Sequence, residues 1–276
     1  MAQTRMFRSD AETDDEVAFM VMLLDFQEAA PSIRRLQAWA LDLAQPQPGE
    51  LVVDVGSGTG AMTRTLGALV MPDGRAVGVE PNPRLREVAD SRSATSSRVS
   101  FVDGLAAHLP FSDGSVDVLW CERVLQHLAD PQAAIDEFAR VLRPGGRAVV
   151  LDTDHASRVT SALEPDVEAK LVAAFMSNLP NPRSARHIPA QAMRAGFTVD
   201  PDIGSAALIF PPRVLLDSPL ITGAADTAVA TGSLGREEAD EAVRALRAAA
   251  EAGHAFAAVT VFGFVLRKPV AGPGRR

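Results

Sequence analysis

Glycines at positions 56, 58 and 60 follow the apolar run Leu51–Val55 in the stretch LVVDVGSGTG. Glycine allows a backbone to approach a bound molecule closely, because no Cβ stands in the way. In open α/β sheets, ligands bind at the carboxyl ends of strands, where this loop would lie. We therefore expect a ligand-binding loop, with a tight strand-to-helix turn as the alternative. Its expected contact residues are Asp54, Gly56, Ser57, Gly58 and Gly60.

The spacing of these glycines limits which ligand the loop can hold. The pattern is G-x-G-x-G, whereas most dinucleotide folds have G-x-G-x-x-G, and the Lys-Ser/Thr ending of a P-loop is absent. Glu80 ends the next apolar run, 24 residues after Gly56. Its carboxylate could accept hydrogen bonds from both hydroxyls of a ribose. A NAD enzyme would use the same residue, so Glu80 does not separate the cofactor classes, and a solvated acid is its alternative.

Composition and charge exclude several classes of partner. The chain has 276 residues, a formal net charge of -8 and no basic run longer than two residues. Nucleic acid is not expected as a partner, because phosphate binding needs a clustered basic face. The N-terminus is polar and acidic, unlike a secretory signal, and the apolar stretch 17–24 is too short to span a bilayer. The single cysteine, Cys121, fits a reducing compartment, so we expect a cytoplasmic protein with no membrane partner.

Apolar runs alternate with helical patterns between residues 51 and 153. The expected strands are 51–55, 76–80, 99–102, 115–121 and 147–153, and the expected helices lie near 61–70, 84–91 and 131–142. This alternation predicts a mostly parallel sheet covered by helices on both faces. Beyond residue 153 this alternation stops. Helices are expected near 160–178, 190–195 and 237–251, a strand or strand pair at 197–200 and 206–210, and a further strand at 256–266.

Five phrases in this core carry a family resemblance. They are VVDVGSGTG, VGVE, LPFSDGSVD, ERVLQHLADP and RVLRPGG, in this order between residues 52 and 146. Together they resemble class I S-adenosylmethionine-dependent methyltransferases, in particular the methyltransferase type 11 enzymes of ubiquinone and menaquinone biosynthesis. The resemblance covers about residues 45–155. It implies a Rossmann-like, mostly parallel seven-stranded sheet with S-adenosyl-L-methionine as the cofactor.

The same resemblance implies roles for individual residues. The three glycines would pass under the methionine part of the cofactor, Asp54 would support the loop, and Glu80 would hold the ribose. The family usually has an aspartate that reaches adenine, and the aligned position here is Leu105, which is a departure from the pattern. Asp103 could substitute, or else backbone and apolar contacts would hold adenine. The remaining expected cofactor contacts are Pro81, Gly104, Ala106 and Glu122.

His155 is the candidate catalytic residue, since it follows the expected strand 147–153 and has an acidic neighbour, Asp154. Histidine is suited to removing a proton near neutral pH, but only an acceptor that must lose a proton needs such a base. Close relatives often have an aromatic residue there, so the alternative for His155 is a wall of the pocket. His127 is interpreted as structuring its turn. Asp152 and Asp154 lack a clear third ligand, so no metal is expected.

The flanking segments predict the organisation and the substrate. We expect an N-terminal helical cap segment at 1–44, the cofactor core at 45–155, and cap insertions with the last strands at 156–276. The cap carries many apolar residues, which predicts an apolar or aromatic small-molecule substrate unless they only pack the cap on the core. They are Phe19, Met22, Phe26, Phe175, Met176, Leu179, Ile209, Phe210, Leu215 and Leu216.

The predicted function is methyl transfer to an oxygen, nitrogen or carbon of that substrate. The Ala- and Arg-rich, Lys-poor composition is typical of GC-rich bacteria, where such enzymes often act in secondary metabolism. One alternative is a cyclase or non-methylating protein that binds the same cofactor. A less favoured alternative is an NAD(P) oxidoreductase, although the absence of tyrosine excludes Tyr-x-x-x-Lys chemistry. The sequence does not determine the oligomeric state, and a homodimer is one of the alternatives.

Overall fold

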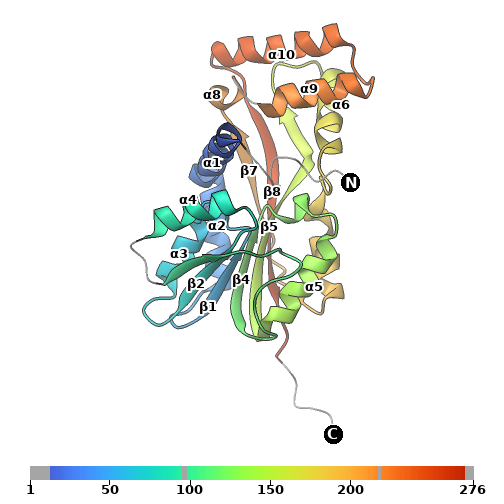
Figure 1. Ribbon diagram of the computed structural model, residues 1–276. Coiled ribbons are helices and arrows are strands. Elements are labelled where there is room, and N and C mark those ends of the chain that lie inside the picture. The colour runs from blue at the N-terminus through green and yellow to red at the C-terminus, as the bar shows by residue number, and fades with distance from the viewer. Residues whose placement is uncertain (1–12, 95–97, 217–218, 271–276) are drawn as a thin grey trace.

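A computed structural model describes residues 13–94, 98–216 and 219–270, and they form an α/β fold around one sheet (Figure 1). The strand order is β3-β2-β1-β4-β5-β8-β6, and β7 also pairs with β8. The first five strands in this order are parallel, and β8 is antiparallel to β5, β6 and β7. The strands are β1 Leu51–Val55, β2 Arg75–Val79, β3 Val99–Val102, β4 Val116–Glu122, β5 Leu142–Thr160, β6 Thr198–Val199, β7 Gly204–Phe210 and β8 Ala257–Arg267.

The predicted mostly parallel, Rossmann-like sheet is confirmed, and the strand number differs by one. Eight strands are present among the described residues, whereas seven were expected. The difference arises because β6 and β7 are separate strands that pair with different parts of the long strand β8. Whether residues 197–210 form one strand or two depends on the length of β8. That length is set by residues 257–267, so the sequence of 197–210 alone does not predict it.

Helices cover both faces of the sheet. The helices are α1 Asp14–Ala29, α2 Pro31–Ala44, α3 Ala61–Leu69, α4 Pro83–Ser93, α5 Pro131–Val141, α6 Pro165–Ser177, α7 Ile188–Arg194, α8 Pro212–Leu215, α9 Pro219–Ala230 and α10 Arg236–Glu251. Helices α2 and α3 share one buried cluster with Val52, Val118 and Val149. Helices α5 and α7 share another with Val53 and Val150. Alternate residues of each strand therefore face opposite layers, as expected for a sheet buried on both sides.

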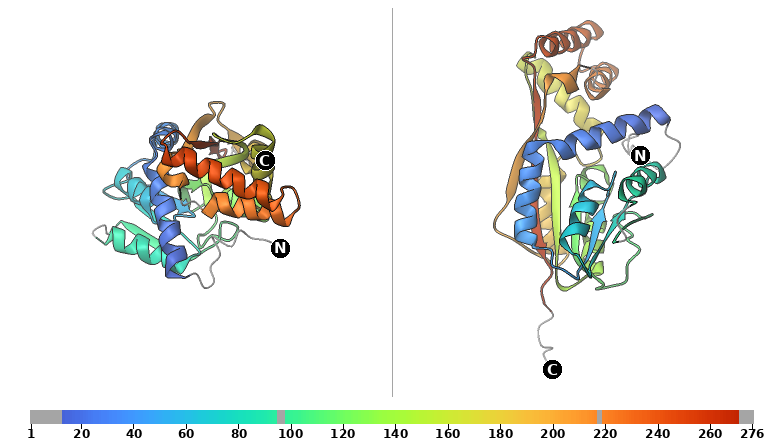
Figure 2. Two further views of the ribbon diagram at one scale, coloured as in Figure 1. Left: turned by 90° about the horizontal axis from the view of Figure 1, so that it is seen from above. Right: turned by 90° about the vertical axis from the view of Figure 1, so that its left-hand side faces the viewer.

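Strand β5 is much longer than the predicted strand 147–153. It runs from Leu142 to Thr160, and its pairing with β8 continues to Thr160↔Ala257. Figures 1 and 2 show β5, β7 and β8 extending past the core to carry α6, α8, α9 and α10. The cap insertion expected after residue 155 therefore begins inside a strand. Helices α8 and α9 were not predicted, and α9 packs with α6 and α10 around Ala228 and Leu171.

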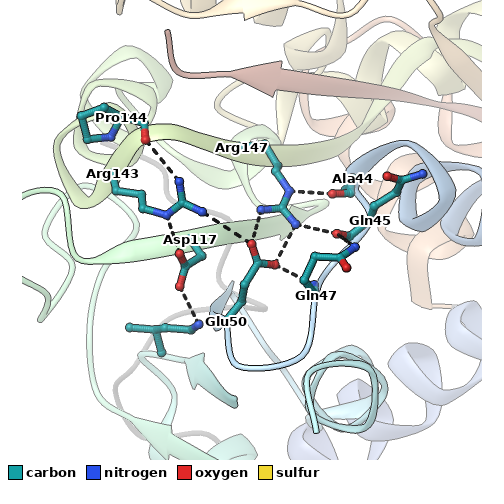
Figure 3. A network of polar contacts seen from close by, with 9 residues as sticks. Ala44, Gln45, Gln47, Glu50, Asp117, Arg143, Pro144 and Arg147 are labelled. Carbon is teal, nitrogen blue, oxygen red and sulfur yellow. Dashed lines mark hydrogen bonds and ion pairs between the residues drawn. The ribbon is translucent and has the colours of Figure 1, made fainter. Parts of the chain in front are cut away.

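A polar network ties the opposite, amino-terminal edge of the sheet together (Figure 3). The guanidinium of Arg147 on β5 donates hydrogen bonds to both carboxylate oxygens of Glu50, at 2.6 and 2.7 Å, and to the carbonyls of Ala44 and Gln45. Arg143 pairs with Asp117 at 2.5 Å. These contacts hold the end of α2 and the start of β1 against β4 and β5, at the edge of the sheet opposite the glycine loop.

Within the part of the chain that the structure describes, no helix combines the length and apolar composition needed to cross a membrane.

Candidate functional site

A cavity of about 420 Å³ opens at the carboxyl edge of the sheet. Its walls come from the loops after β1, β2 and β4, from α1, and from the cap elements α6, β7 and α9. Asp54, Gly56, Ser57, Gly58 and Glu80 line one end, and His155, Phe175 and Phe210 line it toward the cap. The glycine loop and the cap thus face one shared space.

Glu80 is held rigidly at the end of β2. One carboxylate oxygen accepts a hydrogen bond from the Gly58 backbone N–H at 3.0 Å, and the other accepts from the Asn82 N–H at 3.0 Å. The side chain is buried, with 7% of its surface exposed, and it lines the cavity. A carboxylate accepts hydrogen bonds from hydroxyl groups, so Glu80 is of the right type and in the right place to contact a ligand in the cavity.

The glycine loop needs its glycines for its backbone shape. Gly56, Gly58 and Gly60 have φ angles of 71°, 52° and 76°, in the left-handed region that other residues rarely adopt. A Cβ on Gly56 would lie 2.4 Å from the Val124 side chain. Gly60 does not line the cavity, and it caps α3 instead. Ser57 lines the cavity, and its buried hydroxyl has no hydrogen-bond partner among the described residues.

Asp54 lies beneath the loop and is almost fully buried. It accepts a 2.6 Å hydrogen bond from the Thr63 hydroxyl. Burial, and then the nearby charges of Glu122, Glu28 and Glu80, raise the pKa of Asp54 to about 7. Burial beside Glu122 also raises the pKa of Glu28 above its ordinary value. The cavity end at the glycine loop is therefore rich in carboxylates, which suits a positively charged ligand.

Glu122 is the last residue of β4, Arg123 follows it, and both line this end of the cavity. Glu122 accepts hydrogen bonds from Gln37 at 3.0 Å and from the Trp120 indole at 3.3 Å, and it forms an ion pair with Arg123 at 3.3 Å. The ion pair joins the end of β4 to the loop that follows it, and Glu122 is also placed to contact a ligand. Its role in cofactor binding stays a prediction.

The residues expected around adenine lie outside the cavity lining. The carboxylate of Asp103 pairs with Arg86 at 2.8 Å, and Arg86 also donates to the Glu80 carbonyl. Leu105 is 61% exposed, and it forms an isolated bridge with His108. Gly104 and Ala106 do not line the cavity either, whereas Pro81 and Leu85 do. Adenine contacts by residues 103–106 therefore stay a prediction.

A bulge in β5 brings His155 to the cavity. Asp154 pairs with Thr260 and Val159 pairs with Ala258, so four residues, 155–158, stand opposite Val259 alone. The bulge is held by polar contacts. Ser157 donates to the Asp154 carbonyl at 2.7 Å and accepts from the Thr260 N–H at 2.8 Å. Asp154 pairs with Arg186 at 2.7 Å and does not line the cavity.

The hydrogen bonds of His155 assign its tautomer. Gln126 donates its amide to the Arg123 carbonyl, so its Oε1 must accept the 2.7 Å hydrogen bond from His155 Nε2. His155 Nδ1 is therefore unprotonated, and it is buried with no partner among the described residues. Burial, Arg158 and His127 lower the pKa of His155 well below its ordinary value. The imidazole is neutral at physiological pH and presents an acceptor atom.

Sequence reasoning missed several residues that line the cavity. Gln126 orients His155, and Arg158 and Asn178 add polar groups near the cap. No local pattern marks Arg158 and Asn178, because only the bulge and the fold of the cap bring them to the cavity, whereas Gln126 lies in the phrase ERVLQHLADP. Of the predicted apolar cap residues, Phe175, Leu179 and Phe210 line the cavity, whereas Met22 and Ile209 are exposed.

No group of three potential metal ligands lies together among the residues that the structure describes. Asp152 is fully buried and accepts hydrogen bonds from the backbone N–H groups of Thr153 and Gln126.

Comparison with known proteins identifies the domain. Residues 53–150 match the family model described as a methyltransferase domain. An uncharacterized 37.1 kDa protein in a transposon of Streptomyces fradiae is 34% identical over 203 residues, which cover 71% of this chain and 55% of that protein. A ubiquinone/menaquinone biosynthesis C-methyltransferase of Ectopseudomonas mendocina is 32% identical over 122 residues, which cover 43% of this chain and 48% of the enzyme. The chain spans about half the length of the curated relatives it matches.

Solved structures share the fold. A methyltransferase from Aquifex aeolicus that depends on S-adenosylmethionine superposes with a TM-score of 0.53 and 14% identity, over 91% of this chain and 99% of that one. The cyclase SpnF superposes with a TM-score of 0.51 and 20% identity, over 86% of this chain and 81% of that one. The shared fold therefore does not separate methyl transfer from cyclisation. The domain match and the curated relatives support the predicted family and its cofactor, and residues 53–150 match a methyltransferase domain.

Proposed function

We propose that this protein transfers the methyl group of S-adenosylmethionine to an apolar or aromatic small molecule. The observation that carries the proposal is the continuity of the cavity, which is shared by the glycine loop and by the cap residues Phe175, Leu179 and Phe210. A donor on the loop and an acceptor under the cap would then meet in one enclosed space. Exclusion of water and alignment of the two reactants are what this displacement requires.

The residues present fit the cofactor. Both oxygens of Glu80 are oriented by backbone N–H groups, and the side chain lines the cavity, where its carboxylate would accept hydrogen bonds from the ribose hydroxyls. The buried Ser57 hydroxyl is available as a further polar contact. Asp54, Glu28 and Glu122 surround the loop end with carboxylates, which would stabilise the positive charges of the methionine part. When bound, S-adenosylmethionine supplies an activated methyl group on its sulfonium.

His155 is the chain's candidate for handling a proton of the acceptor. Its Nδ1 is unprotonated, lacks a partner among the described residues, and belongs to a residue that lines the cavity. It could accept a hydrogen bond from an acceptor hydroxyl and take the proton as the oxygen–methyl bond forms. An electron-rich carbon or an amine would need this group less. We propose His155 as the catalytic base for an oxygen acceptor.

The curated relatives support an aromatic acceptor. Enzymes named for ubiquinone/menaquinone biosynthesis and as demethylmenaquinone methyltransferases match this chain at 30–36% identity. Their matches span only 38–51% of this chain, however, so the identity of the acceptor cannot be transferred from them to the whole chain. A role in secondary metabolism, with an acceptor chosen by this cap, stays part of the proposal.

The test uses S-adenosylmethionine with a deuterated methyl group and a panel of phenols, quinols and aromatic amines. Mass spectrometry would detect both S-adenosylhomocysteine and the labelled product. We expect at least one acceptor to gain the label, with S-adenosylhomocysteine formed in equal amount. Tight binding of S-adenosylhomocysteine without any labelled product would favour a cyclase or a non-methylating protein. Binding of NADH in place of S-adenosylhomocysteine would refute the assignment altogether.

A further inference from the structure

One positive charge in the cavity has no negative partner. Arg158 lies in the β5 bulge and lines the cavity, and its Nε is buried without a hydrogen-bond partner. Among the described residues, no carboxylate forms an ion pair with its guanidinium and no group is in hydrogen-bond contact with it. Burying an unpaired charge is costly, so such a charge usually meets a ligand or a partner.

The surroundings of Arg158 hold it in place without neutralising it. The guanidinium carbon lies 4.0 Å from the centre of the Phe175 ring and 5.8 Å from that of Phe210. Stacking on an aromatic face stabilises a cation and covers one face of the guanidinium. The N–H groups at its edge remain able to donate. Burial lowers the pKa of Arg158 to about 10, so the group stays charged at neutral pH.

The two ends of the cavity carry opposite charge. The carboxylates of Glu28, Asp54, Glu80 and Glu122 line the end at the glycine loop, together with Arg123. At the end toward the cap, Arg158 is the charged side chain among the described lining residues, and the neutral His155 lies beside it. The first end matches a cationic cofactor. The second end matches a ligand with a negative charge.

We propose that Arg158 binds a carboxylate on the acceptor substrate. This inference rests on the proposed function, since it concerns the molecule that receives the methyl group. A planar guanidinium that is stacked on one face presents parallel N–H groups at its edge, the arrangement that carboxylates accept in a bidentate manner. Phe175 and Phe210 both line the cavity near the guanidinium and would supply apolar contact to the rest of the substrate. The substrate is therefore an apolar or aromatic acid.

The test compares benzoate with benzamide, which have nearly the same shape and differ in charge. Calorimetry would measure the binding of each to protein saturated with S-adenosylhomocysteine. We expect benzoate to bind at least about tenfold more tightly than benzamide, as is typical of a charge-assisted hydrogen-bonded pair. Arg158→Met should remove this preference, and Arg158→Lys should retain part of it. Arg244→Met, an exposed arginine on α10, is the matched control and should change neither affinity.

A second measurement tests whether the carboxylate that Arg158 binds belongs to the substrate or to the cofactor. Affinities for S-adenosylhomocysteine, which has a carboxylate, and for methylthioadenosine, which has none, would be measured with the wild-type protein and Arg158→Met. We expect both affinities to stay within about twofold, a change well below that for loss of a charged hydrogen bond. A selective loss of S-adenosylhomocysteine binding would assign Arg158 to the cofactor and overturn the proposal.

The remaining outcomes are also decisive. Equal binding of benzoate and benzamide, or no measurable binding of benzoate, would overturn the role of Arg158 while leaving cofactor binding intact. Failure to bind S-adenosylhomocysteine would instead count against the proposed function. If Arg158→Met does not fold, Arg158→Lys and Phe175→Leu give the test, because the first keeps a positive charge and the second keeps the guanidinium but removes the ring on which it stacks. Thermal unfolding would verify that each variant is folded.

Discussion

Replacing Glu80 with glutamine should weaken the binding of S-adenosylhomocysteine strongly. Glutamine keeps the shape of the side chain but turns one acceptor oxygen into an NH₂ donor. In the structure both oxygens accept a backbone N–H, from Gly58 and from Asn82, each at 3.0 Å. In Glu80→Gln one of these N–H groups faces a donor, and one ribose hydroxyl loses a charged acceptor.

The size of the effect follows from these contacts. A hydrogen bond to a charged group contributes about 1.5–3 kcal/mol, and loss of a neutral anchoring bond adds about 1 kcal/mol. The sum of about 2.5–4 kcal/mol corresponds to an affinity about 60- to 700-fold weaker, at about 1.4 kcal/mol per tenfold. The matched control is Glu87→Gln, an exposed acid on α4 that forms an ion pair with Arg84, which should leave the affinity within about twofold.

Calorimetry with S-adenosylhomocysteine and with its 2′-deoxy and 3′-deoxy analogues would test the reasoning. The wild-type protein should lose affinity when a ribose hydroxyl is missing, and Glu80→Gln should lose much less, because the interaction is already absent. Additive losses would mean that Glu80 does not contact the ribose. A change below about threefold for S-adenosylhomocysteine itself would refute the calculation above. Thermal unfolding of the free protein would show that the loop is still folded.

Three further variants test other parts of the structure. Glu50→Ala should lower the free energy of unfolding by about 3–5 kcal/mol, measured by urea denaturation, because it leaves the buried Arg147 guanidinium without its carboxylate. Between pH about 4 and about 7, the folded protein holds a proton on Asp54 that the unfolded chain has lost, because folding raises the pKa of this carboxyl. The contribution of Asp54 to the free energy of unfolding therefore falls as pH rises through this range. Asp54→Asn, which keeps an acceptor for Thr63, should therefore raise the melting temperature of the cofactor-free protein at pH about 8, and an unchanged or lower value would contradict the pKa shift. With a hydroxyl acceptor, His155→Ala should lower kcat about 100-fold or more with little change in the affinity for S-adenosylhomocysteine, and activity of the wild type should show no His155 titration between pH about 6 and 8, since its pKa lies well below that range.

Local signals were enough to predict the end of the cavity that the glycine loop and Glu80 line. The strand Leu51–Val55 is apolar and ends at the glycine loop, and the expected bounds agree with those of β1. Glu80 could be predicted for the same reason, because it closes a short apolar run followed by a proline. Such residues are positioned by their own strand and turn, so the sequence within about ten residues contains the needed information.

The acceptor half could not be predicted in the same way. The sequence predicts a strand at 147–153, because polar residues follow Leu151. In the structure β5 continues to Thr160, since it pairs with β8 up to that residue. Arg158 in isolation is typical of a solvated surface residue. Only the bulge and the placement of Phe175 against it show that its charge lies in a cavity. Contacts between residues so distant in sequence are set by the tertiary fold.

Residues 103–106, which are expected to contact adenine, show a different limit of prediction from sequence. The family pattern aligns its adenine-binding aspartate with Leu105. In the structure the side chain of Leu105 is 61% exposed, and Asp103 forms an ion pair with Arg86. A pattern transferred from relatives assumes an unchanged loop conformation. The contacts at 103–106 depend on a short bridge between Leu105 and His108, and this bridge has no signature of its own in the sequence.

The bulge at residues 155–158 has a consequence for how such a protein could diversify. Four residues of β5 stand opposite one residue of β8, and pairing is regular on both sides. Gaining or losing a residue within this segment would re-aim the side chains that face the acceptor, while the ladder on either side keeps its register. The cofactor loop, which is built on β1 and β2, would not change. Descendants of one ancestral chain could therefore acquire new acceptors through a change in length at a single point, without a period in which the methyl donor is bound poorly.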